Sequence, residues 1–168
     1  MHRFDIASSS GTGNADIDGQ LQTLFDMANE LLFPTAGEPS LVEFRRGVSF
    51  LLSYLEYHFA SEELAMLEQG YASRGFHTAF HDHVHREARA IAARLGRTAS
   101  IEETRTAIFF LLEDWRVYHV AQADRQLATY LREQSMDGEI PRLPGILPLK
   151  AVGALAPDFD ERVLAVRQ

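Results

Sequence analysis

The chain has 168 residues, the usual length of a single domain. Its formal net charge of −8 argues against a nucleic-acid partner. It contains no cysteine, which excludes disulfides, thiolate zinc sites, iron–sulfur clusters and thiol nucleophiles. Met1 to Asn14 shows no apolar run of the signal-peptide kind, and no stretch approaches the length of about 18 apolar residues that a membrane span needs. We therefore expect a cytoplasmic protein with no membrane association.

Four segments with the apolar spacing of amphipathic helices follow a polar, flexible arm at residues 1–14. These segments cover roughly residues 16–33, 40–70, 73–95 and 100–134. Ser40 and Ser100 each stand three positions before a glutamate, which is the spacing of a capping box. None of the six prolines falls inside the last three segments. The pattern predicts an all-α, antiparallel up-down-up-down four-helix bundle over residues 15–134.

Residues 135–168 differ from the predicted bundle because four prolines interrupt them. The stretch from Asp158 to Val166 could form a short helix in this otherwise irregular C-terminal extension. Two interpretations remain open at this stage. The extension is either a linker or loosely docked segment, or a segment that covers a bundle face or a subunit interface.

Three pairs of potential metal ligands, each with at least one histidine, lie on the predicted helices: His58 with Glu62, His77 with His81, and His119 with Asp124. Residues four apart stack on one face of a helix, so each of the first two pairs can hold an ion from one side. Such a ligand set suits non-haem iron, manganese or zinc. In a bundle, one ion could sit against the three histidines of the last two helices and a second against His58. Glu62 and Asp124 could then bridge the two ions.

This pattern resembles hemerythrin and its bacterial relatives over about residues 15–132. The motifs that carry the resemblance are Ile17-Asp18-x-Gln20, Tyr54-x-x-x-His58-Phe59-x-x-Glu62, His77-x-x-x-His81 and Trp115-x-x-x-His119-x-x-x-x-Asp124. The resemblance implies a four-helix bundle with a non-haem di-iron centre that binds oxygen. It also implies that His77, His81 and His119 hold one iron and His58 the other, with Glu62 and Asp124 as bridges.

Two positions depart from the family pattern. Leu21 stands where the first-helix motif of the family has an iron-ligating histidine. We therefore expect a second iron that is weakly bound or partly occupied, or a single-iron site. Candidates to fill the vacant ligand position are Gln20, Gln22, Tyr54 and His2.

Arg116 stands where the family usually has leucine, three residues before His119. It could donate hydrogen bonds to peroxide or an anion, pair with a bridging carboxylate, or turn outward to solvent. By the resemblance, the residues expected to line the ligand pocket are Leu21, Leu24, Phe59, Trp115, Arg116 and Val120. Glu63 is expected to be a solvated neighbour of Glu62, and His83 to be exposed.

Both departures favour sensing or binding of O2 or a related small ligand, such as peroxide, NO or a small anion, over reversible oxygen transport. A di-iron oxidase or peroxidase that uses the open second iron is the alternative, and iron storage or scavenging is a further one. Whether the protein is an enzyme stays open. A homo-oligomer or a signalling partner is compatible with these readings, and a sensor would need such a partner for its output.

Overall fold

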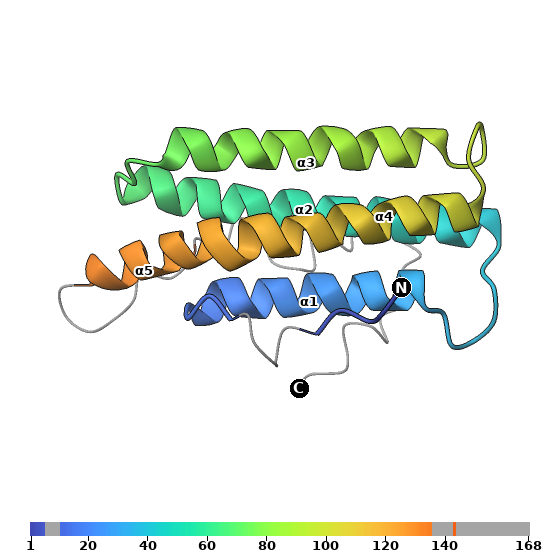
Figure 1. The fold of residues 1–168 in the computed structure, drawn as a ribbon, viewed down its shortest axis with the longest axis horizontal. Coiled ribbons are helices and arrows are strands. Elements are labelled where there is room, and N and C mark those ends of the chain that lie inside the picture. Colours follow the sequence, from blue (N-terminus) through green and yellow to red (C-terminus); the bar gives the residue numbers. More distant parts are fainter. Residues whose placement is uncertain (6–10, 136–142, 144–168) are drawn as a thin grey trace.

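The computed structural model describes residues 1–5, 11–135 and 143, and the helices among them form the predicted bundle (Figure 1). Its elements are α1 (Ala15–Leu32), α2 (Leu41–Glu68), α3 (Arg74–Arg94), α4 (Ile101–Trp115), the π-helix η1 (Arg116–Asp124) and α5 (Arg125–Glu133). The last three run end to end as one long fourth helix. Consecutive helices run in opposite directions and pack side by side, with α1 against α2, α2 against α3 and α3 against α4. The predicted all-α, up-down-up-down fold is confirmed.

The helix boundaries follow from local chemistry. Ser40 and Ser100 form the two expected capping boxes. At the first of these, the Ser40 hydroxyl accepts from the Glu43 N–H at 3.3 Å, and the Glu43 carboxylate accepts from the Ser40 N–H at 2.7 Å. Gly70 and Gly96 follow the ends of α2 and α3 with positive φ angles of 66° and 71°. Other residue types avoid this left-handed conformation, so each glycine stops its helix and turns the chain back.

The described part of the N-terminal arm is irregular, as expected, but it lies against the bundle rather than extending from it. Residues 1–5 run beside α1 (Figure 1). The Phe4 ring is 4% exposed and stacks on Phe25 with ring centroids 5.0 Å apart. The Phe4 backbone N–H donates to the Asn29 side chain, whose amide donates back to the Phe4 carbonyl, both at 2.8 Å. A buried aromatic ring and a reciprocal hydrogen-bond pair thus dock a segment whose sequence is mostly polar.

Leu143 is the one described residue of the C-terminal extension beyond Ser135. It is buried, and its backbone N–H donates to the Asp16 carboxylate at 3.0 Å, which places it beside the first turn of α1. The extension therefore contacts the bundle at this residue. The other residues of the extension, including the short helix expected from Asp158 to Val166, lie outside the described residues.

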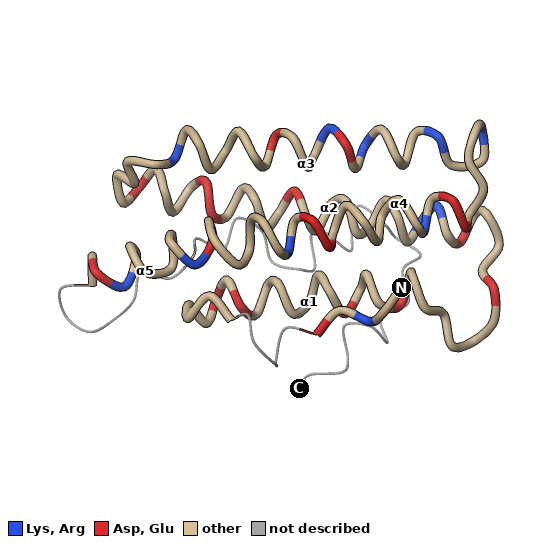
Figure 2. The backbone as a smooth tube through the Cα atoms, viewed as in Figure 1, with Lys and Arg blue, Asp and Glu red and all other residues tan. Residues whose placement is uncertain are grey.

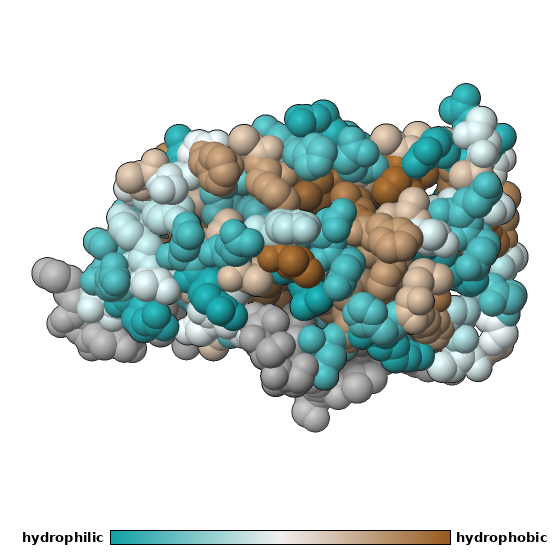
Figure 3. Space-filling model, viewed as in Figure 1, coloured by the Kyte–Doolittle hydropathy of each residue, from teal (hydrophilic) through white to brown (hydrophobic). Residues whose placement is uncertain are grey.

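The surface is typical of a bundle that faces water. Acidic residues lie on every labelled helix in Figure 2, and basic residues lie on all of them except α1. On the face shown in Figure 3, apolar residues gather toward the middle of the bundle among hydrophilic neighbours. Among the helices of residues 11–135, none is long and apolar enough to cross a membrane.

The buried hydroxyl of Tyr54 predicts a loss of stability at high pH. Burial raises the pKa of Tyr54 to about 12, from a usual value near 10. The unfolded chain therefore releases this proton at lower pH than the folded chain. The stability that the neutral phenol contributes is complete below pH 10 and is lost as the pH rises toward 12. Each pKa unit corresponds to about 1.4 kcal/mol, so we expect a fall of roughly 2–3 kcal/mol over this range. Chemical denaturation from pH 9 to 12 measures it, and Tyr54→Phe should flatten the curve. An equally steep curve for Tyr54→Phe would assign the loss to other groups.

Candidate metal centre

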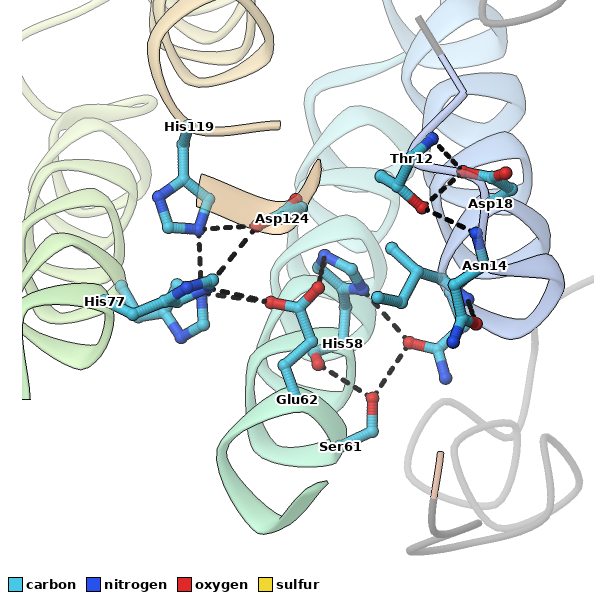
Figure 4. Close-up of polar contacts among 12 residues, drawn as sticks. Thr12, Asn14, Asp18, His58, Ser61, Glu62, His77, His119 and Asp124 are labelled. Carbon is cyan, nitrogen blue, oxygen red and sulfur yellow. Dashed lines mark hydrogen bonds and ion pairs between the residues drawn. The ribbon is translucent and has the colours of Figure 1, made fainter. Parts of the chain in front are cut away.

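Five buried side chains converge in the interior of the bundle. Each offers one ligand atom, and these atoms all lie within 4.8 Å of one another; they belong to Glu62, His77, His81, His119 and Asp124. Glu62 comes from α2, the first two histidines from α3, and the other two residues from η1. Figure 4 shows the labelled members of this set pointing toward one another from three helices. We call these five residues the cluster. All are 2% exposed or less, so the cluster lies in the apolar core.

The separations within the cluster fit the ligand shell of one ion. His77 Nε2 lies 3.2 Å from Glu62 Oε2 and 3.4 Å from Asp124 Oδ1. His119 Nε2 lies 2.9 Å from Asp124 Oδ1 and 3.0 Å from His81 Nε2. Two ligand atoms that each stand about 2.1 Å from a shared ion, at a right angle, are about 3 Å apart. The cluster therefore has the dimensions that a transition-metal ion requires.

The charge balance of the cluster also fits a cation. Burial by itself would raise the pKa values of Glu62 and Asp124, but the surrounding histidines outweigh it and hold both pKa values below their usual range, Glu62 well below. Two ionised carboxylates in an apolar core need positive charge nearby. Burial would lower the pKa of His77, yet hydrogen bonds with Asp124 and Glu62 raise it to about 9. A proton on His77 thus supplies, without metal, part of the positive charge that a cation would bring.

His58 lies beside the cluster but outside it. Its Nε2 is 3.7 Å from Glu62 Oε1. His58 Nε2, Glu62 Oε1 and Asp124 Oδ2 are all buried and have no hydrogen-bond partner among the described residues. Polar atoms left unpaired in a core are rare and ask for an explanation. A second cation between them would provide one, and it would have three protein ligands.

Hydrogen bonds from outside the cluster fix the orientation of two imidazoles. His58 Nδ1 lies 3.0 Å from Gln20 Oε1, which also accepts from the Ser61 hydroxyl at 2.9 Å. His81 Nδ1 lies 2.9 Å from Glu63 Oε1. An acceptor at Nδ1 keeps the proton there and leaves the Nε2 lone pair free for a metal.

These contacts revise two expectations and add one residue. Glu63 is not merely a solvated neighbour of Glu62, because its carboxylate holds His81. Gln20, considered as a replacement ligand, uses its side-chain oxygen to hold His58 instead. Ser61 was not anticipated at all. Its position directly before Glu62, three residues after His58, was the only sequence signal that it faces the site.

The π-helix η1 brings His119 and Asp124 together. Residues five apart lie about 140° from each other around an α-helix and face different sides. A π-helix, which bonds residue i to i+5, has more residues in each turn, so residues five apart lie much closer to the same side. The observed 2.9 Å between His119 Nε2 and Asp124 Oδ1 depends on this wider turn. The prediction of a regular α-helix throughout residues 100–134 is therefore wrong at Arg116–Asp124.

Aromatic side chains contact the imidazoles of the site. Phe59 stacks on His81 with centroids 4.0 Å apart, and Trp115 meets His58 edge-on at 5.6 Å. The expected pocket residues Leu21, Leu24, Phe59, Trp115 and Val120 are all at most 5% exposed. The cluster residues themselves are at most 2% exposed, and this low exposure to water strengthens the electrostatic interactions among them.

Arg116 turns away from the cluster. Its guanidinium donates to both oxygens of Glu113, at 3.0 and 2.7 Å, one turn earlier on the fourth helix. This is the outward orientation among those considered for it, with no pairing to a cluster carboxylate. His83 is exposed, as expected, while His85 pairs with Glu56 at 2.6 Å on the surface. His2 lies 3.9 Å from Glu113 and packs on Phe109, so neither it nor Tyr54, which is buried in α2, belongs to the cluster.

Three comparisons place this arrangement among known proteins. Residues 12–131 match the profile of the hemerythrin HHE cation binding domain. A bacteriohemerythrin of Methylococcus capsulatus is 31% identical over 121 residues, which span 71% of this chain and 88% of that protein. A crystal structure of a hemerythrin with a leucine-to-alanine substitution superposes with a TM-score of 0.65 and 27% identity, and the match covers 78% of this chain and 97% of that one.

Proposed function

This chain belongs to the hemerythrin HHE cation-binding family, and we propose that it is a non-haem iron protein that binds O2 or a related small ligand for sensing rather than for transport. Family membership and the buried cluster both fit a non-haem iron protein that binds O2. The observation that carries the proposal is the convergence of three imidazoles and two ionised carboxylates within 4.8 Å in a dry core. Iron held there would supply a redox-active centre with affinity for O2.

The residues have distinct tasks in this proposal. His77, His81 and His119 would hold one iron, and Glu62 and Asp124 would share their oxygens between it and a second iron at His58. Glu63 orients His81, while Gln20 and Ser61 orient His58. The apolar side chains around them would keep water and protons away from the bound ligand.

The second iron is proposed to be weak, because α1 contains no histidine that could bind it. Leu21, fully buried on α1, occupies the place at which the family motif has a histidine. An iron held by His58 and two shared carboxylates keeps several positions open. This openness also favours the second candidate function, an oxidase or peroxidase that uses those positions.

Iron stoichiometry tests the proposal. Wild-type protein is expected to keep one iron per chain after dialysis and to lose most of the second. Leu21→His should retain two, with affinity for the second iron raised at least about tenfold, since even indirect partners of a metal change affinity by 10–100-fold. Leu21→Met, which has a similar volume but no imidazole, is the matched control and should behave as wild type.

The outcomes separate the alternatives. Two tightly held irons in wild type would show that Leu21 does not weaken the second site, and no bound iron would refute the whole function. An absorption change under O2 that reverses under nitrogen supports binding. Continuous peroxide turnover supports the enzyme, and more than two irons per chain supports storage.

A further inference from the structure

A hollow of about 100 Å³ opens between the start of α3 and η1 and reaches the cluster from outside. His77 and His119 form part of its lining although they are only 2% and 1% exposed. Phe76 and Tyr118 line it as well, and they are 81% and 60% exposed. The hollow therefore leads from the surface to the outer edges of two cluster imidazoles. A site that senses only O2 does not need an aromatic hollow that opens to the surface.

Aromatic rings form the walls of this hollow. Beside Phe76 and Tyr118, Phe80 stands nearly parallel to the His119 ring, with centroids 4.6 Å apart and an angle of 22° between the planes. Large apolar side chains that stay exposed around a concavity often mark a binding site. Flat rings on several sides favour a flat occupant, because offset and edge-to-face ring pairs are more favourable than the burial of the same area alone.

Apart from His77 and His119, whose Nε2 atoms face the carboxylates of the cluster, the polar groups of the lining are uncharged. The side chains of Ser73, Gln122 and Gln126 offer hydroxyl and amide groups, which both donate and accept hydrogen bonds. No aspartate, glutamate, lysine or arginine lines the hollow. An ammonium ligand would lack a carboxylate there, and a carboxylate ligand would lack a free cation, because Glu62 and Asp124 already neutralise His77. The lining thus suits a neutral molecule that carries a hydrogen-bonding group.

We propose that this hollow binds a small uncharged aromatic ring with a hydroxyl group, a ligand of the phenol class. The ring packs between the aromatic walls, and its hydroxyl bonds to the amides of Gln122 and Gln126 or to the Ser73 hydroxyl. A closed cavity of about 150 Å³ holds a whole benzene ring. A hollow of about 100 Å³ that is open to solvent therefore admits such a ring in part, with its inner edge against His77 and His119.

Titration with phenol, observed by ligand NMR on the full chain, tests this proposal. A ligand of this size should bind with a dissociation constant on the order of 1 mM. Cyclohexanol, benzoate and benzylammonium, which lack planarity or neutrality, should bind at least tenfold more weakly. Equal binding of all four compounds, or no saturable binding of phenol, would overturn the proposal.

Two matched variants test the location. Gln126 lines this hollow, whereas Thr129, three residues further along α5, lines only the neighbouring one. Gln126→Phe should fill the hollow and weaken phenol binding at least tenfold, and Thr129→Phe should bind as wild type. Circular dichroism checks that both fold. Unchanged affinity in Gln126→Phe, or equal losses in both variants, would place phenol elsewhere.

A final arm, which rests on the proposed function, uses the iron-loaded protein. Saturating phenol should shift the absorption bands of bound iron in wild type and in Thr129→Phe, but not in Gln126→Phe. If the metal-free protein binds phenol but phenol does not shift the iron bands, the phenol site stands and its contact with the cluster is refuted. A protein that binds phenol but no iron would refute the proposed function and leave the phenol site standing.

Discussion

Replacing His119 by alanine is expected to remove tightly bound iron from the protein. His119 Nε2 is one of the proposed ligand atoms and lies 2.9 Å from Asp124 Oδ1 and 3.0 Å from His81 Nε2. Loss of an indirect partner weakens metal binding by 10–100-fold, so loss of a direct ligand should exceed about 100-fold. The iron content of dialysed protein, followed by competition with a chelator of known affinity, measures the change.

His83→Ala is the matched control for this experiment. His83 is an exposed histidine on α3, two residues from His81, so its removal should leave the iron content unchanged. Circular dichroism of metal-free His119→Ala shows whether the bundle still forms. If it does not, His77→Ala provides the same test from another helix. A folded His119→Ala protein with wild-type iron content would exclude His119 as a ligand.

Phe25→Ala is expected to produce the largest loss of stability away from the cluster. The Phe25 side chain is fully buried on α1 and contacts two other aromatic rings, Phe4 at 5.0 Å and Trp115 at 5.7 Å between centroids. Truncation of a buried phenylalanine lowers the free energy of unfolding by about 3–5 kcal/mol. Domains have only about 5–15 kcal/mol in total, so the variant should lose a large share of its stability. Its melting temperature should fall on the order of 10 °C.

The same substitution at an exposed site controls for helix propensity. Phe110 on α4 is 58% exposed, and Phe110→Ala should change the free energy of unfolding by less than about 0.5 kcal/mol. Both variants are compared with wild type by thermal and denaturant unfolding of metal-free protein. Similar losses in Phe25→Ala and Phe110→Ala would mean that the core around α1 does not hold the bundle together.

The fold was predictable because its signals are local. Ser40 and Ser100 carry the complete capping box in four consecutive residues, and Gly70 and Gly96 end their helices through one backbone conformation. The docking of Phe4 was not predictable, because its partners Phe25 and Asn29 are more than 20 residues away. A polar arm with one aromatic residue has no sequence pattern that predicts which helix it will pack against.

The candidate site was predictable in its ligand types but not in its hydrogen bonds. Pairs four apart on one helix, such as His77 and His81, show their shared face in the sequence. The partner of a long side chain depends on its rotamer and on the neighbouring helix. Glu63 reaches His81 across to α3, and Arg116 reaches back to Glu113, although their sequence positions allowed other partners equally well.

The π-helical turn of η1 has a torsional consequence. Each residue advances an α-helix by about 100°, so conversion of residues 116–124 to regular α-helix would separate His119 from Asp124 and rotate α5 about its own axis relative to α4. An ion held by both residues favours the wide turn. By thermodynamic reciprocity, the wide turn favours the ion. An ion bound by both residues would therefore couple occupancy of the cluster to the rotational setting of α5.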